Sequence, residues 1–340
     1  MFFSKLAKQK SVVGVDIGTS YIKIVQVTHG ATVPVLDTYG IVDMSGQIDP
    51  NNKEQAVIQT AGILRDLLAK ARVTTTHCVA SLPNSAVFTS VVDMPLMSDD
   101  ELASAMPFEA KKYVPLPIAE VALSWSIVTK DEAAKTQKVL LIAVPVSVRE
   151  SYIKLFALAQ LELEIIEIEA LALIRSLVTM QQQNSIIIDI GAKSTGLNVI
   201  KDGLLQLTRN LNVGGDTITE RIATSLNINR VRAEQFKKDF GMSKSTFVPE
   251  SVKPVLSVIK SEILQLITLY RSHSVSIERI VLVGGSAALP GITDFFGDLG
   301  PEVIIGNPLT GVTYPQTIQP VITRYSYQLP IAVGLALRNE

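Results

Sequence analysis

The sequence predicts an α/β protein built from two similar halves, each a strand–hairpin–helix unit that carries one inserted segment. A motif at residues 12–20 recurs at residues 186–195, about half the chain later. Each copy is an apolar run, typical of a buried strand, that ends in Asp-Ile-Gly and leads through hydroxyl residues into a second strand. The half-chain spacing of the two copies indicates a duplication.

The first half opens with strands joined by tight glycine turns. A helix follows, because apolar residues recur there at helical spacing. A short strand closed by Pro83 and Asn84 completes this part. The expected strands are residues 12–17, 21–28, 33–42 and 77–82, and the expected helix is residues 53–70.

The next segment has a different texture and predicts an inserted strand–helix–strand unit. Pro95 ends the strand at 88–94, and Ser98 with Glu101 forms a capping box for a helix that runs through Tyr113, interrupted by Pro107. A second strand is expected at 121–128. The parent sheet should then resume at 138–145, followed by helices at 148–161 and 167–180.

The second half repeats the plan of the first. Asp202-Gly203 predicts a hairpin turn, and Thr217 to Glu220 is expected to be the capping box of the next helix. The expected strands are residues 186–190, 196–201, 204–210, 279–283 and 303–305, and the expected helices are residues 230–240, 252–271 and 330–338.

These elements predict four parts. The first subdomain comprises residues 1–84 and 139–184, and its insertion comprises residues 85–138. The second subdomain comprises residues 185–215 and 273–340, and its helical insertion comprises residues 216–272.

Composition narrows the class of protein. At 340 residues, with 47% hydrophobic residues and a mean hydropathy of +0.31, the chain can bury large cores and is not disordered. A net charge of −1 gives no electrostatic basis for binding nucleic acid, so no such partner is expected. The single cysteine excludes an internal disulfide, and the three scattered histidines exclude a histidine metal cluster.

No apolar stretch reaches the length of a membrane span, and the basic segment at residues 1–10 lacks the apolar core of a signal peptide. We therefore expect a cytoplasmic protein whose link to a membrane runs through a partner. The basic segment either touches a membrane or partner or is a solvated tail, and both interpretations stay open.

The two hairpins are the strongest candidate site, because a glycine at each turn lets a phosphate approach backbone N–H groups. Facing turns would hold a polyphosphate from both sides. The contacts expected from the two turns are Gly18, Thr19 and Ser20 on one side, and Gly191, Ala192, Lys193, Ser194 and Thr195 on the other.

Asp16 and Asp189 end the two strands and are predicted to hold Mg²⁺ through water, since Mg²⁺ keeps most of its hydration shell. Lys23 either neutralises phosphate or is an outward-facing strand lysine.

Two further glycine sites fit a nucleotide. Gly284, Gly285 and Ser286 follow a strand and would let a ribose or adenine lie against the backbone; the alternative is a strand–helix packing turn. Gly214, Gly215 and Asp216 would offer N–H donors to phosphate or ribose at a helix start, or form an ordinary helix entry. Phosphate-loop and dinucleotide-binding fingerprints are absent.

These glycine sites, in this order and with two insertions, resemble the actin, Hsp70 and sugar-kinase ATPase superfamily over essentially the whole chain. The superfamily fold comprises two duplicated ribonuclease-H-like domains. Residues 94–102, 108–115 and 329–338 look like the PilM family, the actin-like component of type IV pilus assembly, which is itself similar to FtsA. The first two stretches place the first insertion where FtsA-like proteins carry theirs.

The resemblance implies ATP with Mg²⁺ between the halves, with Glu234 and Lys237 near the adenosine. Without it, these two residues would be a solvated helix face. Glu169 stands where the superfamily often orients the attacking water, although an ordinary helix-start glutamate has the same pattern. Whether the protein hydrolyses ATP therefore stays open, and we expect weak or no ATPase activity.

The resemblance also implies a partner, the N-terminal cytoplasmic tail of a PilN-like single-span membrane protein, held in a groove between the first half and its insertion. Other pilus assembly and motor proteins, self-association, a role in twitching motility and a peripheral place at the inner face of the cytoplasmic membrane follow from the same family. Candidate groove residues are Val87, Val91, Phe108 and Val114.

Two other functions stay open. One is an FtsA-like filament-forming, membrane-associated ATPase; FtsA needs a C-terminal linker and amphipathic helix, and neither precedes the end of this sequence at residues 338–340. The other is a small-molecule kinase of the same fold, with Asp216 as general base for a substrate hydroxyl.

Overall fold

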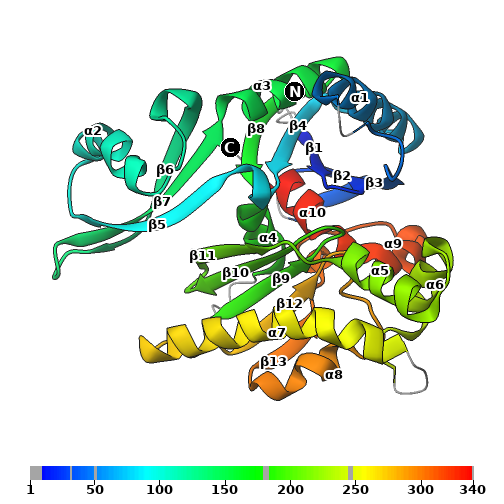
Figure 1. Cartoon of the computed structure of the whole chain (residues 1–340). Coiled ribbons are helices and arrows are strands. Elements are labelled where there is room, and N and C mark those ends of the chain that lie inside the picture. Colours follow the sequence, from blue (N-terminus) through cyan, green and yellow to red (C-terminus); the bar gives the residue numbers. More distant parts are fainter. Residues whose placement is uncertain (1–9, 31–32, 50–51, 179–183, 244–247, 339–340) are drawn as a thin grey trace, which may run out of the picture.

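The computed structural model describes residues 10–30, 33–49, 52–178, 184–243 and 248–338. Residues 1–9 of the basic segment, the end of the helix expected to reach residue 180, and residues 339–340 lie outside this range. The described chain forms two five-stranded sheets and one three-stranded sheet (Figure 1).

The first sheet has the order β3-β2-β1-β4-β8. Its antiparallel strands β1, β2 and β3 meet the parallel strands β4 and β8 at β1. Helices α1 and α3 pack against one another and share an apolar core with these strands. The bounds are β1 Ser11–Ile17, β2 Tyr21–Thr28, β3 Val35–Asp43, α1 Lys53–Lys70, β4 His77–Leu82, α3 Val146–Leu158 and β8 Glu162–Ile168.

Strand β8 was not predicted. Its sequence alternates acidic and apolar residues until Ile165, a pattern of period two that indicates a strand. The helix expected from residue 167 begins instead at Glu169, as α4 (Glu169–Leu177). The carboxyl end of β8 thereby delivers Glu169 to the same sheet edge as the end of β4.

The second sheet has the order β11-β10-β9-β12-β13, which repeats the order and strand directions of the first sheet and confirms the duplication. Asp202 and Gly203 both have positive φ, 53° and 76°, as the predicted hairpin turn requires. The bounds are β9 Ser185–Ile190, β10 Thr195–Lys201, β11 Leu204–Leu211, β12 Arg279–Val283 and β13 Glu302–Ile305.

Helices α5 to α8 build the remainder of the second core. Helix α5 begins at Gly215 with Gly214 as its N-cap, and the Gly214 N–H donates to Thr217 Oγ1 at 3.4 Å. The capping box expected at Thr217–Glu220 is therefore wrong, because the helix has already begun there. The bounds are α5 Gly215–Leu226, α6 Arg230–Phe240, α7 Val248–Ser272 and α8 Ile292–Phe296.

The inserted unit is a three-stranded sheet of order β5-β7-β6 with α2 beside it. The expectation that residues 138–145 resume the parent sheet is wrong: this segment lies in β7, which pairs with both β5 and β6, so the boundary expected at 138 falls inside a strand. The capping box of Ser98 and Glu101 is confirmed, whereas the α-helix ends at Glu109, soon after Pro107. The bounds are β5 Phe88–Pro95, α2 Asp99–Glu109, β6 Val121–Asp131 and β7 Thr136–Pro145.

The last described residues do not stay with the second sheet, as the division at 273–340 predicted. Leu309, Val312 and Ile322 share a core with Val25 and Leu36 of the first sheet. Helix α10 (Pro330–Ala336), which follows α9 (Gln319–Tyr325), packs against β1, β2, β4 and α4 (Figure 1). The physical reason is that α10 is apolar on all sides, so it must be buried between elements.

Two glycines permit this close packing. A side chain at Gly14 of β1 would overlap the carbonyl oxygen of Ala332, and one at Gly334 of α10 would overlap the carbonyl oxygen of Ala172 in α4. Helix α10 thus lies with its backbone against both β1 and α4.

Across the described residues, no helix combines the length and the hydropathy that a membrane crossing requires.

We predict that Gly334→Ala destabilises the protein by roughly 2 kcal/mol or more, because the new methyl group has no space between α10 and α4. Gly62→Ala in α1 is the matched control, since no described residue outside the adjoining backbone of its own helix lies within 4 Å of a Cβ built there. That control should gain up to about 1 kcal/mol from helix propensity. Urea denaturation measures both, and equal stability of the two variants would contradict the packing.

Candidate functional site

The two hairpin turns are built alike. The Gly18 N–H donates to the Tyr21 carbonyl at 2.9 Å, and the Gly191 N–H donates to the Ser194 carbonyl at 3.0 Å. The glycine N–H groups therefore close the turns and are not free for a phosphate, which corrects one detail of the prediction. The residues between Gly18 and Tyr21, and those between Gly191 and Ser194, form the tips of the two turns.

A buried ion pair lies behind the first turn. Register places Lys23 opposite Asp16, and Lys23 Nζ lies 2.9 Å from Asp16 Oδ2. The side chains are 15% and 2% exposed, so Lys23 points into the protein and not outward. Ser81 Oγ at the end of β4 donates to Asp16 Oδ1 at 3.3 Å.

Charges from both halves act on one another at this place. Burial raises the pKa of Asp189, nearby Lys23 opposes this rise and Asp16 adds to it, with a net pKa of about 6. Although burial lowers the pKa of Lys23, Asp16 and Asp189 raise it above its ordinary value. The aspartates that end the two copies of the motif therefore share one electrostatic environment, which also contains the Lys23 cation.

Glu169 belongs to the same cluster. Its Oε2 accepts a hydrogen bond from the Asn84 backbone N–H at 3.1 Å. Burial, together with Asp16 and Asp189, raises its pKa to about 8, although Asn84 and Lys23 act to lower it. At pH 7 the Glu169 carboxyl is therefore mostly protonated, unlike an ordinary glutamate.

Three glycine segments converge behind the second turn. A side chain at Gly284, whose φ is +89°, would overlap Asp189 Oδ1 and lie 2.6 Å from the Ile190 carbonyl oxygen. A Cβ at Gly214 would lie 2.7 Å from the Gly191 carbonyl oxygen. These glycines are required because three chain segments approach one another at backbone distance.

The start of α5 is engaged with the second turn. The Gly215 N–H donates to the Gly191 carbonyl at 2.9 Å, and the Asp216 N–H donates to the Ala192 carbonyl at 2.8 Å. The expectation that these N–H groups are free donors for phosphate or ribose is wrong. They hold the turn against the helix instead.

Glu234 and Lys237 are not a solvated helix face. Lys237 is buried, and its Nζ lies 2.6 Å from Glu234 Oε2, 2.9 Å from Thr219 Oγ1 and 3.1 Å from the Gly215 carbonyl oxygen. Burial lowers the pKa of Lys237 despite Glu234. Burial raises the pKa of Glu234, but Lys237 reverses this effect, so the pKa is lower than usual. Because Lys237 Nζ donates to the Gly215 carbonyl, the pair lies beside the glycine segments.

Asp216 is committed to another partner. Its Oδ1 lies 2.6 Å from Arg230 Nη2 at the start of α6. A carboxylate held by a guanidinium is a poor arrangement for a general base. This ion pair argues against Asp216 as the general base that the small-molecule kinase hypothesis requires.

The predicted residues suit a nucleotide in part. Glycine cradles, a buried cation and a lysine–glutamate pair whose lysine is buried are all present around the two turns. In the parts of the chain that the structure describes, no group of three or more His, Cys, Asp or Glu side chains could hold a metal ion. Asp16 and Asp189 alone suit only a metal that keeps most of its water ligands.

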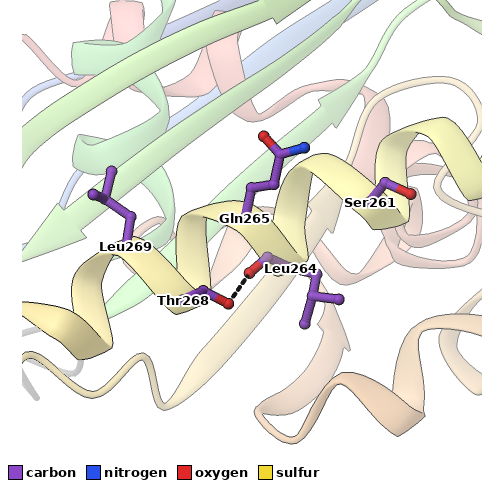
Figure 2. Close-up of a pocket in the computed structure, with 5 residues that line it drawn as sticks. All are labelled: Ser261, Leu264, Gln265, Thr268 and Leu269. Atoms are coloured by element: carbon purple, nitrogen blue, oxygen red, sulfur yellow. Dashed lines mark hydrogen bonds between the residues drawn. The ribbon is translucent and has the colours of Figure 1, made fainter.

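The described cavities lie elsewhere. One of about 560 Å³ is a shallow depression on α7 lined by Ser261, Leu264, Gln265, Thr268 and Leu269 (Figure 2). A second, of about 440 Å³, lies near Arg271, Glu278 and Gly300. Neither is lined by a residue of the hairpin turns.

Among the groove candidates, only Phe108 is strongly exposed, at 71%. Val87 and Val114 are buried in two different cores, so they are unavailable to a partner. Val91 is partly buried against the core that contains Val87. Lys111 Nζ lies 5.2 Å from the centre of the Phe108 ring.

Sequence reasoning missed Ser81 and Asn84. Both lie at or just beyond the carboxyl end of β4, which is parallel to β1. Because the carboxyl ends of parallel strands meet at one sheet edge, this position was a usable signal.

Comparisons with known proteins bear on the family and the fold. A sequence model of the family described as type IV pilus assembly protein PilM matches residues 14–340. A solved structure described as the PilM-PilN type IV pilus biogenesis complex has a TM-score of 0.85 at 25% identity, and the match covers 96% of this chain and 98% of that one.

More distant likenesses show the fold alone. EutJ from Carboxydothermus hydrogenoformans has a TM-score of 0.61 at 21% identity, covering 98% of this chain and 91% of that one. MreB5 of Spiroplasma citri bound to AMPPNP has a TM-score of 0.53 at 13% identity, covering 96% and 95%. The fold is that of the actin-like ATPases.

Curated relatives match over shorter segments. Cell division protein FtsA of Bacillus subtilis is 30% identical over 156 residues, which are 38% of this chain and 35% of FtsA. EutJ of Escherichia coli is 24% identical over 129 residues, 38% of this chain and 43% of EutJ. The chain therefore spans less than half the length of the curated relatives that it matches.

We predict that the free energy of unfolding falls as pH rises from about 4.5 to about 8, because the unfolded state releases the Glu169 proton before the folded state does. Glu169→Gln removes this titration and keeps an acceptor for the Asn84 N–H. The variant should therefore gain on the order of 1–3 kcal/mol relative to wild type between pH 5 and pH 8.5. Urea denaturation across this range measures the difference, and identical pH dependence of the two proteins would refute the assignment.

Proposed function

The chain belongs to the family of type IV pilus assembly protein PilM, and from this premise we propose that it is a nucleotide-binding scaffold of pilus assembly. ATP with Mg²⁺ lies between the two hairpin turns, and a PilN-like membrane protein docks outside. The observation that carries the nucleotide part is the shared environment of Asp16, Lys23 and Asp189, which come from both halves. A ligand of high charge held between the turns suits this environment.

Each part of the site has a proposed role. Lys23 offsets the negative charge of the phosphates, while Asp16 and Asp189 hold Mg²⁺ through its water ligands. Glu234, Lys237 and the Gly284–Ser286 turn contact the adenosine. The turn residues that complete the contacts are Gly18, Thr19, Ser20, Gly191, Ala192, Lys193, Ser194 and Thr195. Bound ATP supplies a hydrolysable phosphoryl group.

Hydrolysis is proposed to be weak or absent. Glu169 is the candidate for orienting the attacking water, but its pKa of about 8 leaves it mostly protonated at neutral pH. A protonated carboxyl cannot accept the proton of that water. ATP occupancy, and not turnover, is then the useful state of the site.

The proposed partner is the N-terminal cytoplasmic tail of a PilN-like single-span membrane protein. Support comes from the solved structure described as the PilM-PilN complex, which aligns with 96% of this chain. The tail would occupy a groove between the first sheet and the inserted sheet, and it would place the protein at the inner face of the cytoplasmic membrane. Contacts with other pilus assembly and motor proteins, and a role in twitching motility, extend the same proposal.

An FtsA-like filament former is the second candidate function, because FtsA of Bacillus subtilis matches 38% of the chain. Negative-stain electron microscopy with ATP separates the two. Filaments would favour the FtsA-like function, and dispersed particles would favour the scaffold.

We predict that Gly285→Val lowers ATP affinity about tenfold or more while leaving stability unchanged. Among the described residues, nothing beyond the two chain neighbours of Gly285 lies within 4 Å of a Cβ built there, so a bound ligand is what the new side chain would meet. Gly297→Val, in the same half and equally open, is the matched control. Calorimetric titration with ATP and Mg²⁺ measures both; equal affinities would place the nucleotide away from this turn.

We predict that Phe108→Ala weakens binding of a synthetic PilN-type tail peptide about tenfold, because exposed aromatic side chains are common anchors of interfaces. Leu264→Ala on α7, an apolar residue that is 52% exposed in the other half, should bind the peptide like wild type. Calorimetry again provides the affinities. If the wild-type protein bound neither ATP nor the peptide, the scaffold proposal would be wrong.

A further inference from the structure

Two side-chain amides, one from each half, lie near the same point of the boundary between the halves. Asn84 begins the short 3-10 helix Asn84–Ala86, which leads from β4 into β5 and so forms the root of the insertion. Asn198 lies on β10 of the second sheet and is fully buried. Asn84 Oδ1 and Asn198 Nδ2 are both buried without a hydrogen-bond partner.

Gly196 brings these amides together. A Cβ at Gly196 would lie 3.1 Å from Asn84 Nδ2 and 3.9 Å from Asn198 Nδ2. Asn198 lies on the same face of β10, two residues further along. The space that a side chain at Gly196 would fill is thus occupied by the amide of Asn84, which belongs to the other half.

The hydrogen-bonding capacity of the two amides is complementary. Thr208 Oγ1 donates to Asn198 Oδ1 at 2.8 Å, which fixes the Asn198 amide and leaves its N–H groups directed elsewhere. Rotating the Asn84 amide by half a turn exchanges its oxygen and nitrogen, which have nearly the same size. Its unpartnered acceptor then stands beside the unpartnered donor of Asn198.

We propose that Asn84 and Asn198 form an inter-lobe amide latch, a direct or water-bridged hydrogen bond that holds the root of the insertion against the second half. Leaving both groups unpaired in the protein interior is costly, and pairing them removes that cost. The latch is independent of any nucleotide or partner.

The surroundings of the latch give it a consequence for the site. Strand β5 and the 3-10 helix lie against β11 of the second sheet, so the insertion and the second half meet here (Figure 1). The backbone N–H of Asn84 also donates to the Glu169 carboxyl group, and Gly196 pairs in register with Asp189. Opening the halves would break the latch and move Glu169 away from Asp189.

The test measures the separation of the insertion and the second half in the full chain without ligand. Spin labels at Ala103→Cys on α2 and Ser257→Cys on α7 report this distance, because both positions are exposed. The lone native cysteine, Cys78, is fully buried and burial raises the pKa of its thiol to about 12, so it resists labelling.

We expect Asn84→Ala to shift the distance distribution to longer values and to broaden it. Ser85→Ala, the exposed neighbour in the same 3-10 helix, should leave the distribution unchanged. Asn198→Ala should act like Asn84→Ala, and the double variant should add nothing to either. Circular dichroism establishes that each variant is folded.

Asn84→Leu, which fills the same space without a polar group, serves as the second variant and should match Asn84→Ala. Distributions identical to wild type for both Asn84 variants would overturn the latch. Additive shifts in the Asn84 and Asn198 double variant would also overturn it, because independent residues share no bond.

Discussion

The arrangement of this protein depends on one buried cation among acidic groups. Lys23 balances Asp16 directly and acts on Asp189 and Glu169 at longer range. Removing one partner of such a buried pair is costly, because the other charge is then unpaired in a medium that solvates it poorly. The cluster also contains groups from both halves. Its interactions therefore persist only while the two sheets keep a fixed position relative to one another. A polyanion with its metal ion would therefore meet charged side chains that the fold already holds in place.

Backbone contacts supply that fixed relation. Helix α10 comes after the second sheet in the chain but packs on the first, where Gly14 and Gly334 let its backbone approach β1 and α4. Glu167, at the end of β8, forms ion pairs with Arg175 of α4 and with Arg338 just beyond α10. Because Glu167 is nearly fully buried, these pairs orient both helices at the junction of the halves. The junction of the halves is therefore held by both backbone packing and buried ion pairs.

The sequence predicted the duplicated hairpins, because period-two strands and glycine turns are local signals. It also placed Asp16 and Asp189 correctly at the ends of equivalent strands. The prediction from sequence failed where pairing with a distant strand determines the structure. Residues 138–145 have the same strand pattern whichever sheet they join. Strand β8 is half-exposed, and its sequence resembles the start of a helix. The commitment of the Gly215 and Asp216 N–H groups to the second turn depends on tertiary contacts that no local pattern encodes.

The central claim is that the two hairpin turns enclose a nucleotide. A crystal structure of the protein grown with AMPPNP and Mg²⁺ tests it most directly. The account predicts density for the triphosphate between residues 18–20 and 191–195, with the metal bound through water to Asp16 and Asp189. Density for the nucleotide at another surface, or turns left without ligand at saturating AMPPNP, would contradict it.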